Sequence, residues 1–237
     1  MTRRRWIADE VSNDRAALTG EHAAHLSRTL RARLGQEFEV VCDGQVRHAT
    51  VASVSDERVE FALGEEIAAN TAAPITLLLA VFKFDRMEWA IEKCTELNVT
   101  SIVPVIARRT EKHLALAADK RVERWRRIAR EVSEQARRVA PPEIGDPVKL
   151  TAALDVAADL RIVLAESERE AQMSEILRAR PESNSLVLAI GPEGGWTPDE
   201  LHLFGAAGWI AASLGDTILR AETAAIAALA VARAELS

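Results

Sequence analysis

The stretch Leu186-Val187-Leu188-Ala189-Ile190-Gly191-Pro192-Glu193-Gly194-Gly195-Trp196-Thr197-Pro198-Asp199-Glu200 decides the fold class of this sequence. Its first five residues are all apolar, which is typical of a strand covered on both faces of a sheet. A glycine-rich turn follows, and then a helix start with Thr197 as N-cap, Pro198 at the first helical position and Glu200 three residues after the cap. A strand, a glycine turn and a helix in this order indicate an open α/β sheet, where ligands bind at such turns.

The same plan extends on both sides of this stretch. Four further apolar runs of strand length lie after Pro74, at residues 75–81, 102–106, 160–165 and 209–214. Helical apolar periods alternate with these runs, at residues 85–97, 120–139, 171–179, 198–207 and 222–236. Alternating strands and helices predict a parallel sheet with helices on both faces.

The N-terminal part of the chain has a different pattern. Three β-rich runs occupy residues 38–42, 45–51 and 58–63, and the first two are joined by Asp43-Gly44, a strong signal for a two-residue hairpin. We predict a small antiparallel β module over residues 1–69. Residues 68–74 have neither period and end in Pro74, so they are expected to link this module to a second domain over residues 74–237.

Length and composition describe an ordinary globular protein. The 237 residues suffice for two modest domains, with 48% hydrophobic and 28% charged residues. Cys42 and Cys94 lie far apart and the five histidines show no ligand spacing, so we expect free thiols and no metal. With no apolar signal segment and no apolar run near the ~20 residues that span a bilayer, we expect a cytoplasmic protein without a membrane partner.

The net charge of −6 conceals two basic segments. Residues 1–35 contain seven arginines and four acids, and residues 108–138 contain eleven Lys and Arg residues and five acids. Two basic segments in an otherwise acidic chain favour a polyanionic partner, although a solvated charged helix would explain the second segment equally well.

A second glycine turn repeats the first one near the C-terminus. Here Gly215 follows the apolar run 209–214, and Thr223 is expected to cap the last helix. Glu222 suits the dipole of that helix, but Arg220 needs a partner, which would be Glu193, a backbone carbonyl or a ligand carboxylate. The first turn lacks the lysine of a phosphate-binding loop, and Glu193 favours a cationic or hydroxyl-bearing ligand; a tight connection that binds nothing remains the alternative.

Five ordered blocks resemble the RsmE family of 16S ribosomal RNA uridine N3-methyltransferases, in the SPOUT superfamily. The blocks are residues 25–31, residues 83–97 with Lys83, Asp85 and Arg86, residues 124–142 with an R-W…E-Q-x-x-R…P pattern, and the two glycine turns. The resemblance covers the whole chain. It departs from the family at Thr217, where an arginine is usual, and at Arg137, where a small residue is common.

The resemblance implies a PUA-like β-barrel that binds RNA, followed by a SPOUT α/β domain with a C-terminal trefoil knot. It also implies a homodimer, S-adenosyl-L-methionine as the cofactor, and 16S rRNA or the small ribosomal subunit as the partner. The implied cofactor-binding residues are Ile190, Gly191, Pro192, Glu193, Gly194, Gly195, Leu214, Gly215, Ile218, Leu219 and Thr223. The implied RNA-binding residues are Arg3, Arg4, Arg5, His25, Arg28, Arg31, Lys83, Arg86 and Arg137.

Methylation of uracil N3 requires loss of the N3 proton, which assigns roles to charged residues of these blocks. Arg138 and Arg220 are the candidates for stabilising the anion that develops on the uracil oxygens, and Glu222 or Glu193 for accepting the proton. Transfer of a methyl group from a sulfonium needs alignment rather than a metal.

Three alternatives stay open at this point. Another SPOUT methyltransferase would modify a different base or ribose, and a non-catalytic RNA-binding protein would share the fold without using the cofactor. A nucleotide-binding enzyme would use residues 191–195 as a phosphate loop.

Overall fold

The computed structural model describes residues 5–67, 72–180 and 182–236. The chain divides into two compact units, which are described separately. The first comprises residues 1–71 and 130–141, and the second comprises residues 72–129 and 142–237. The inclusion of residues 130–141 in the first unit has no counterpart in the sequence pattern. Among the described residues, no helix has both the length and the apolar character needed to cross a bilayer.

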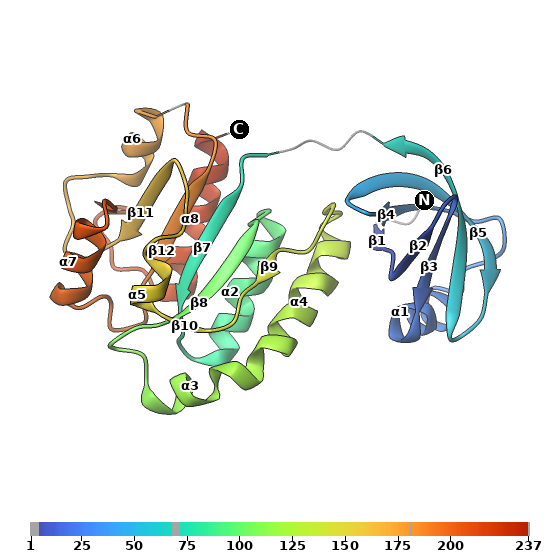
Figure 1. The fold of residues 1–237 in the computed structure, drawn as a ribbon, viewed down its shortest axis with the longest axis horizontal. Helices are drawn as coiled ribbons and strands as arrows, with labels where there is room; N and C mark the ends of the chain where they lie inside the picture. The colour runs from blue at the N-terminus through green and yellow to red at the C-terminus, as the bar shows by residue number, and fades with distance from the viewer. Residues whose placement is uncertain (1–4, 68–71, 181, 237) are drawn as a thin grey trace. The chain divides into compact units, whose positions relative to one another are not determined.

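The first unit is built on a curled six-stranded sheet with the strand order β1-β4-β5-β6-β3-β2 (Figure 1). The strands are β1 (Trp6–Ile7), β2 (Glu10–Ser12), β3 (Arg15–Thr19), β4 (Glu37–Cys42), β5 (Gln45–Val54) and β6 (Arg58–Ile67). The predicted hairpin is confirmed, since Asp43 and Gly44 join β4 to β5 with φ values of 51° and 81°. Trp6, Leu18, Leu26, Phe38 and Phe61 form the centre of its core.

Two features of this unit differ from the prediction. β1 pairs with β4 in parallel, so the sheet is not wholly antiparallel. The long connection between them makes this possible, because a parallel pair needs a crossover of a dozen or more residues. That connection also contains α1 (Gly20–Ala24) and a π-helical turn, η1 (His25–Thr29). No apolar period predicts this helical segment, because Ala23 and Leu26 alone of its residues are buried.

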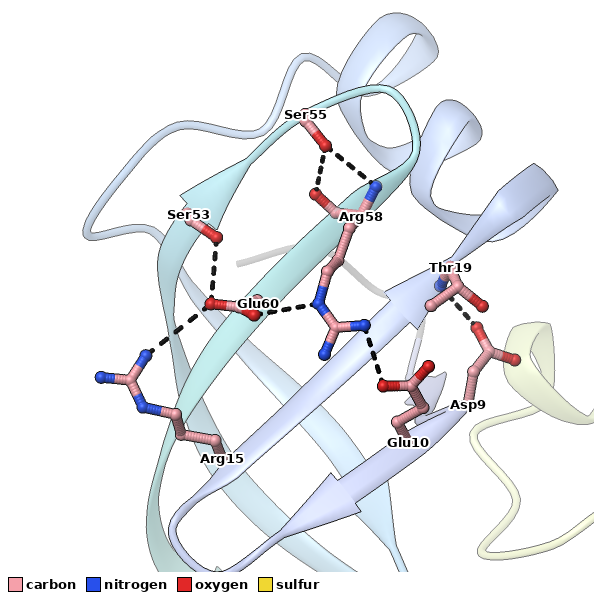
Figure 2. A network of polar contacts seen from close by, with 8 residues as sticks. All are labelled: Asp9, Glu10, Arg15, Thr19, Ser53, Ser55, Arg58 and Glu60. Carbon is pink, nitrogen blue, oxygen red and sulfur yellow. Dashed lines mark hydrogen bonds and ion pairs between the residues drawn. The ribbon is translucent and has the colours of Figure 1, made fainter.

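Charged side chains on β2, β3 and β6 form a connected network (Figure 2). The Arg58 guanidinium on β6 donates to Glu60 at 2.9 Å and to Glu10 at 2.8 Å. Arg15 lies 3.7 Å from Glu60, which also accepts a hydrogen bond from Ser53. Arginines on this face of the sheet therefore already have acidic partners within the protein.

The second unit contains a seven-stranded sheet in which every pair is parallel. Its order is β10-β8-β7-β12-β11-β13, with β9 paired to β8. The strands are β7 (Ile75–Ala80), β8 (Ser101–Ile106), β9 (Glu143–Ile144), β10 (Val148–Lys149), β11 (Leu160–Leu164), β12 (Leu186–Ile190) and β13 (Ile210–Ala212). The prediction of a parallel sheet is confirmed, and a strand forms at each of the five predicted runs, although β13 is shorter than the run 209–214.

Helices cover both faces of this sheet (Figure 1). They are α2 (Phe84–Glu96), α3 (Lys112–Ala117), η2 (Ala118–Arg121), α4 (Val122–Gln135), α5 (Leu150–Ala153), α6 (Met173–Arg178), α7 (Pro198–Ala206) and α8 (Ala221–Glu235). Alternate residues of one strand enter different cores, as Leu77 packs with residues of α2 and α8, and Leu78 with residues of α5 and α7. Burial on both faces explains the uninterrupted apolar runs.

Candidate active site

A cavity of about 750 Å³ lies in the second unit, where β11, β12 and β13 end. The carboxyl ends of parallel strands are the usual place for ligands in open α/β sheets. Every residue predicted to bind the cofactor lines this cavity, with the exceptions of Gly194 and Thr223. The two glycine turns, which are separated in sequence, therefore meet at one cavity.

The first turn, residues 191–195, is built by local backbone contacts. The Gly195 N–H donates to the Pro192 carbonyl at 2.8 Å, and Gly195 has a φ of +67°, which favours glycine. A Cβ atom on Gly191 would lie 3.3 Å from Nε1 of Trp196. The predicted capping box is confirmed, since Thr197 Oγ1 accepts from the Glu200 N–H and the Glu200 side chain accepts from the Thr197 N–H.

The second turn, residues 213–220, is more open. The Ser213 hydroxyl both donates to the Gly215 carbonyl and accepts from the Gly215 N–H, and Gly215 has a φ of +127°. Ile218 is 79% exposed. The N-cap of α8 is Arg220 and not Thr223 as predicted, because the chain leaves extended backbone at Arg220. Thr223 lies on the exposed side of the first turn of α8.

Charged groups of different accessibility lie at this end of the sheet. Glu222 is 3% exposed; its Oε1 atom lies 3.8 Å from Arg86 Nε, and its Oε2 atom has no hydrogen-bond partner in the described chain. Arg220 and Glu193 are exposed and line the cavity, and neither pairs with the other or with another described residue. Within the described residues, Arg220 therefore pairs neither with Glu193 nor with a backbone carbonyl through its side chain.

Sequence reasoning missed part of the cavity wall. Arg109 after β8 lines it, and so do Glu166 and Arg169 after β11. No motif marked these residues, although each follows the carboxyl end of a buried strand. A position after the carboxyl end of a buried strand is the sequence feature that could have predicted them as lining residues.

The other predicted catalytic residue, Arg138, belongs to the first unit. Its Nε atom donates to the Ala140 carbonyl at 3.1 Å and its N–H to the Ser133 carbonyl at 2.8 Å. It is not among the residues that line the cavity of the second unit.

Predicted RNA-binding residues of the first unit are partly used within the protein. Arg5 donates to Glu39 at 2.7 and 3.0 Å, and Arg137 forms an ion pair with the same carboxylate. These partners, with the Arg137 hydrogen bond as the largest cause, lower the pKa of Glu39. Arg28 pairs with Asp56 at 2.8 Å on the surface, whereas Arg31 is exposed.

The remaining members of that set are in varied surroundings. His25 packs near the Trp6 ring at a centroid distance of 6.0 Å, while Lys83 is exposed at the start of α2 and Arg86 reaches the cavity. Arg3 and Arg4 lie outside the described residues.

Several arginines of the basic segment 108–138 also form ion pairs within the protein. Arginines of this segment that pair with acids are Arg121, Arg124, Arg126, Arg130 and Arg137. Most of these acids lie outside the segment, so the local excess of +6 is partly neutralised in the fold.

Neither cysteine is among the residues that line this cavity. Burial raises the pKa of the Cys94 thiol to about 12, and Cys42 is buried as well. A thiol with so high a pKa is a poor nucleophile at neutral pH. Within the described ranges, no group of three or more His, Cys, Asp or Glu side chains is arranged to hold a metal ion.

Known proteins resemble this chain over most of its length. A family model described as an RNA methyltransferase domain matches residues 69–233. Ribosomal RNA small subunit methyltransferase E of Bacillus subtilis is 32% identical over 225 residues, which cover 90% of this chain and 87% of the relative. The same-named protein of Synechocystis is 30% identical and covers 94% of this chain.

Solved structures agree with these relatives. Ribosomal RNA small subunit methyltransferase E from Neisseria gonorrhoeae, crystallised bound to S-adenosyl methionine, has a TM-score of 0.84 at 30% identity, covering 96% of this chain and 95% of its own. A methyltransferase from Legionella pneumophila in complex with the same cofactor has a TM-score of 0.84 at 28% identity, covering 97% and 96%. The chain therefore belongs to the RsmE family of ribosomal RNA methyltransferases.

Proposed function

We propose that this protein transfers a methyl group from S-adenosyl-L-methionine to N3 of a uridine in 16S ribosomal RNA. The observation that carries the proposal is the cavity formed jointly by the two glycine turns. Relatives with the same fold bind S-adenosyl methionine and are named for action on small-subunit rRNA.

The cavity fits this cofactor on several grounds. Its volume lies within the ~300–1,000 Å³ usual for small-molecule sites. Apolar side chains of Leu164, Ile190 and Leu219 supply walls, and the glycines leave backbone groups open to a ligand. Trp196 Nε1, in the cavity lining, is buried without a hydrogen-bond partner among the described residues. Glu193 offers a negative charge to a sulfonium or an ammonium group.

The bound cofactor would supply an activated methyl group, and the protein's residues would prepare the acceptor. Arg220, exposed at the cavity and without a protein partner, would stabilise the negative charge that develops on a uracil oxygen. Glu222, next to the lining residue Ala221, would accept the N3 proton. Its Oε2 atom has no hydrogen-bond partner among the described residues, and its Oε1 atom lies 3.8 Å from Arg86 Nε. Arg138 is proposed as a second cation for the uracil, supported by its place in the matched R-W…E-Q-x-x-R block.

Finer features follow from the same family resemblance. We propose that the curled sheet is a PUA-like barrel within residues 1–69, and that residues 74–237 form a SPOUT domain with a C-terminal trefoil knot. The knot is proposed on the resemblance. A homodimer is proposed on the resemblance alone, and a ribosomal substrate would place the reaction in the cytoplasm.

Methyl transfer to purified small subunits and to free 16S rRNA would test this function. We expect labelled methyl from S-adenosyl-L-methionine to appear as N3-methyluridine when the RNA is digested and analysed by mass spectrometry. Methyl on another base or on ribose would favour another SPOUT activity. An absence of cofactor heat in calorimetry would favour a non-catalytic RNA-binding protein, and competition by ATP a nucleotide-binding enzyme.

A further inference from the structure

The turn that follows β8 is hydrogen-bonded to Val81, the residue directly after the neighbouring strand β7. The Thr110 N–H donates to the Ala107 carbonyl at 3.1 Å, and the Ala107 N–H donates to Thr110 Oγ1 at 3.2 Å. The Thr110 hydroxyl in turn donates to the Val81 carbonyl at 3.1 Å. These hydrogen bonds fix the position of residues 107–110 relative to the sheet.

From this turn, the Arg109 side chain reaches the first glycine turn. Its guanidinium donates to the Gly194 carbonyl and, at 3.4 Å, to the Trp196 carbonyl. The stem of Arg109 lies against Gly194, where an added Cβ would be 3.2 Å from Arg109 Cδ. A charged donor held against a carbonyl of the turn and against the carbonyl of the next residue restricts the turn more than a neutral hydrogen bond would.

A second connection joins the same two segments. The Arg108 N–H donates to Glu200 Oε1 at 2.8 Å. Glu200 Oε2 accepts from the Thr197 N–H at 2.8 Å and from the Thr197 hydroxyl at 2.9 Å. Glu200 is buried, so the start of α7 is tied to the turn after β8 through one carboxylate.

We propose that Arg109 is a positioning residue that holds the glycine turn 191–195 in its cofactor-binding shape. The proposal rests on the proposed function above. Between the buried end of β12 and the capped start of α7, Arg109 reaches from another segment to the carbonyls of Gly194 and Trp196. A turn ordered before binding pays less conformational entropy when the ligand arrives, so cofactor affinity rises.

Three variants test this role. In Arg109→Ala we expect cofactor affinity to fall about tenfold, the size of a lost charged hydrogen bond, with kcat at saturating cofactor changed less than about threefold. Arg109→Lys should recover most of the affinity, because an ammonium still reaches one carbonyl. Arg108→Ala is the matched control, since Arg108 contributes its backbone N–H, and it should bind as the parent protein does. Calorimetry gives the affinities.

Amide hydrogen exchange of the unliganded protein provides a readout that is independent of cofactor binding. We expect faster exchange at residues 193–196 in Arg109→Ala and unchanged exchange in Arg108→Ala. Unchanged exchange or unchanged affinity in Arg109→Ala would overturn the proposal, as would a large loss of kcat with normal affinity. If the parent protein shows no cofactor binding, the proposed function fails, and exchange alone then decides whether Arg109 orders the turn.

A double-variant cycle separates a contact with Arg109 from a contact with ligand. Gly194→Ala places a methyl group against the Arg109 stem, so it should weaken cofactor binding in the parent protein. In the Arg109→Ala background the methyl group has room, and its additional effect should be smaller. Strictly additive effects of the two changes would contradict the proposed contact.

Discussion

Arginines of the two units have different surroundings. In the first unit, Arg5 and Arg137 converge on Glu39, and Arg58 bridges Glu10 and Glu60 (Figure 2). At the cavity of the second unit, Arg220 has no partner among the described residues, and Arg86 lies 3.8 Å from its nearest acid. Arginines of the first unit thus form ion pairs within the protein, whereas Arg220 at the cavity of the second unit is available to a ligand.

The difference shows that net charge alone does not tell which arginines lack a partner within the protein. Arg5 and Arg137 share the carboxylate of Glu39, whereas Arg220 has no such partner among the described residues. Paired arginines should therefore affect stability when changed, and unpaired ones should affect activity.

Arg220→Ala is expected to give the largest effect. Loss of one preorganised cation at a developing negative charge typically lowers kcat by ~100-fold or more. The melting temperature should stay near that of the parent protein, because no described residue depends on Arg220. Steady-state methyl transfer and thermal denaturation measure the two quantities. Arg220→Lys, which retains the charge, should be intermediate, and parental kcat in Arg220→Ala would remove Arg220 from the proposed site.

Glu39→Gln should show the opposite pattern. Removing the charge shared by Arg5 and Arg137 leaves two guanidiniums without their acid, which we expect to lower the free energy of unfolding by about 1–3 kcal/mol. Glu37→Gln, two residues earlier on the same face of β4 and exposed, is the control. Denaturant unfolding gives both values. Equal stabilities of the two variants would show that the cluster contributes nothing.

The contribution of Glu39 should depend on pH with a defined sign. Its pKa in the folded protein is lowered from the ordinary 4.5, mainly by the hydrogen bond from Arg137. The stabilisation is then fully present above pH 4.5 and is lost as pH falls through the lower folded value. The difference in unfolding free energy between the parent protein and Glu39→Gln should shrink across this range. A difference that grows on acidification would contradict the pairing.

Local chemistry explains what the sequence predicted well. The strands β7, β8, β11, β12 and β13 follow from apolar runs that are buried on both faces, and the cap at Thr197 follows from its spacing to Glu200. Asp43-Gly44 makes a hairpin because both residues adopt positive φ. These features depend on residues that are neighbours in the chain.

Features that depend on distant residues were missed. The parallel pairing of β1 with β4 joins residues more than thirty positions apart, as Trp6 is opposite Val40. Thr223 is a good capping residue by type, but the loop before α8 places Arg220 at the cap. Arg109 lies beside the glycine turn because the parallel sheet brings the ends of β8 and β12 to the same edge. The residues next to Arg109 in the sequence do not indicate this contact.

The smallest expected effect concerns the backbone of Arg137, a member of the cluster formed by Arg5, Glu39 and Arg137. It has a φ of +58°, which costs a non-glycine residue about 1 kcal/mol or more. Arg137→Ala loses the ion pair and keeps the strain, whereas Arg137→Gly loses the ion pair and relieves it. We therefore expect the glycine variant to be more stable than the alanine variant by about 1 kcal/mol in denaturant unfolding, less the entropy that glycine adds to the unfolded chain. If the alanine variant is more stable than the glycine variant by the full entropy that glycine adds to the unfolded chain, the backbone at this position is not strained.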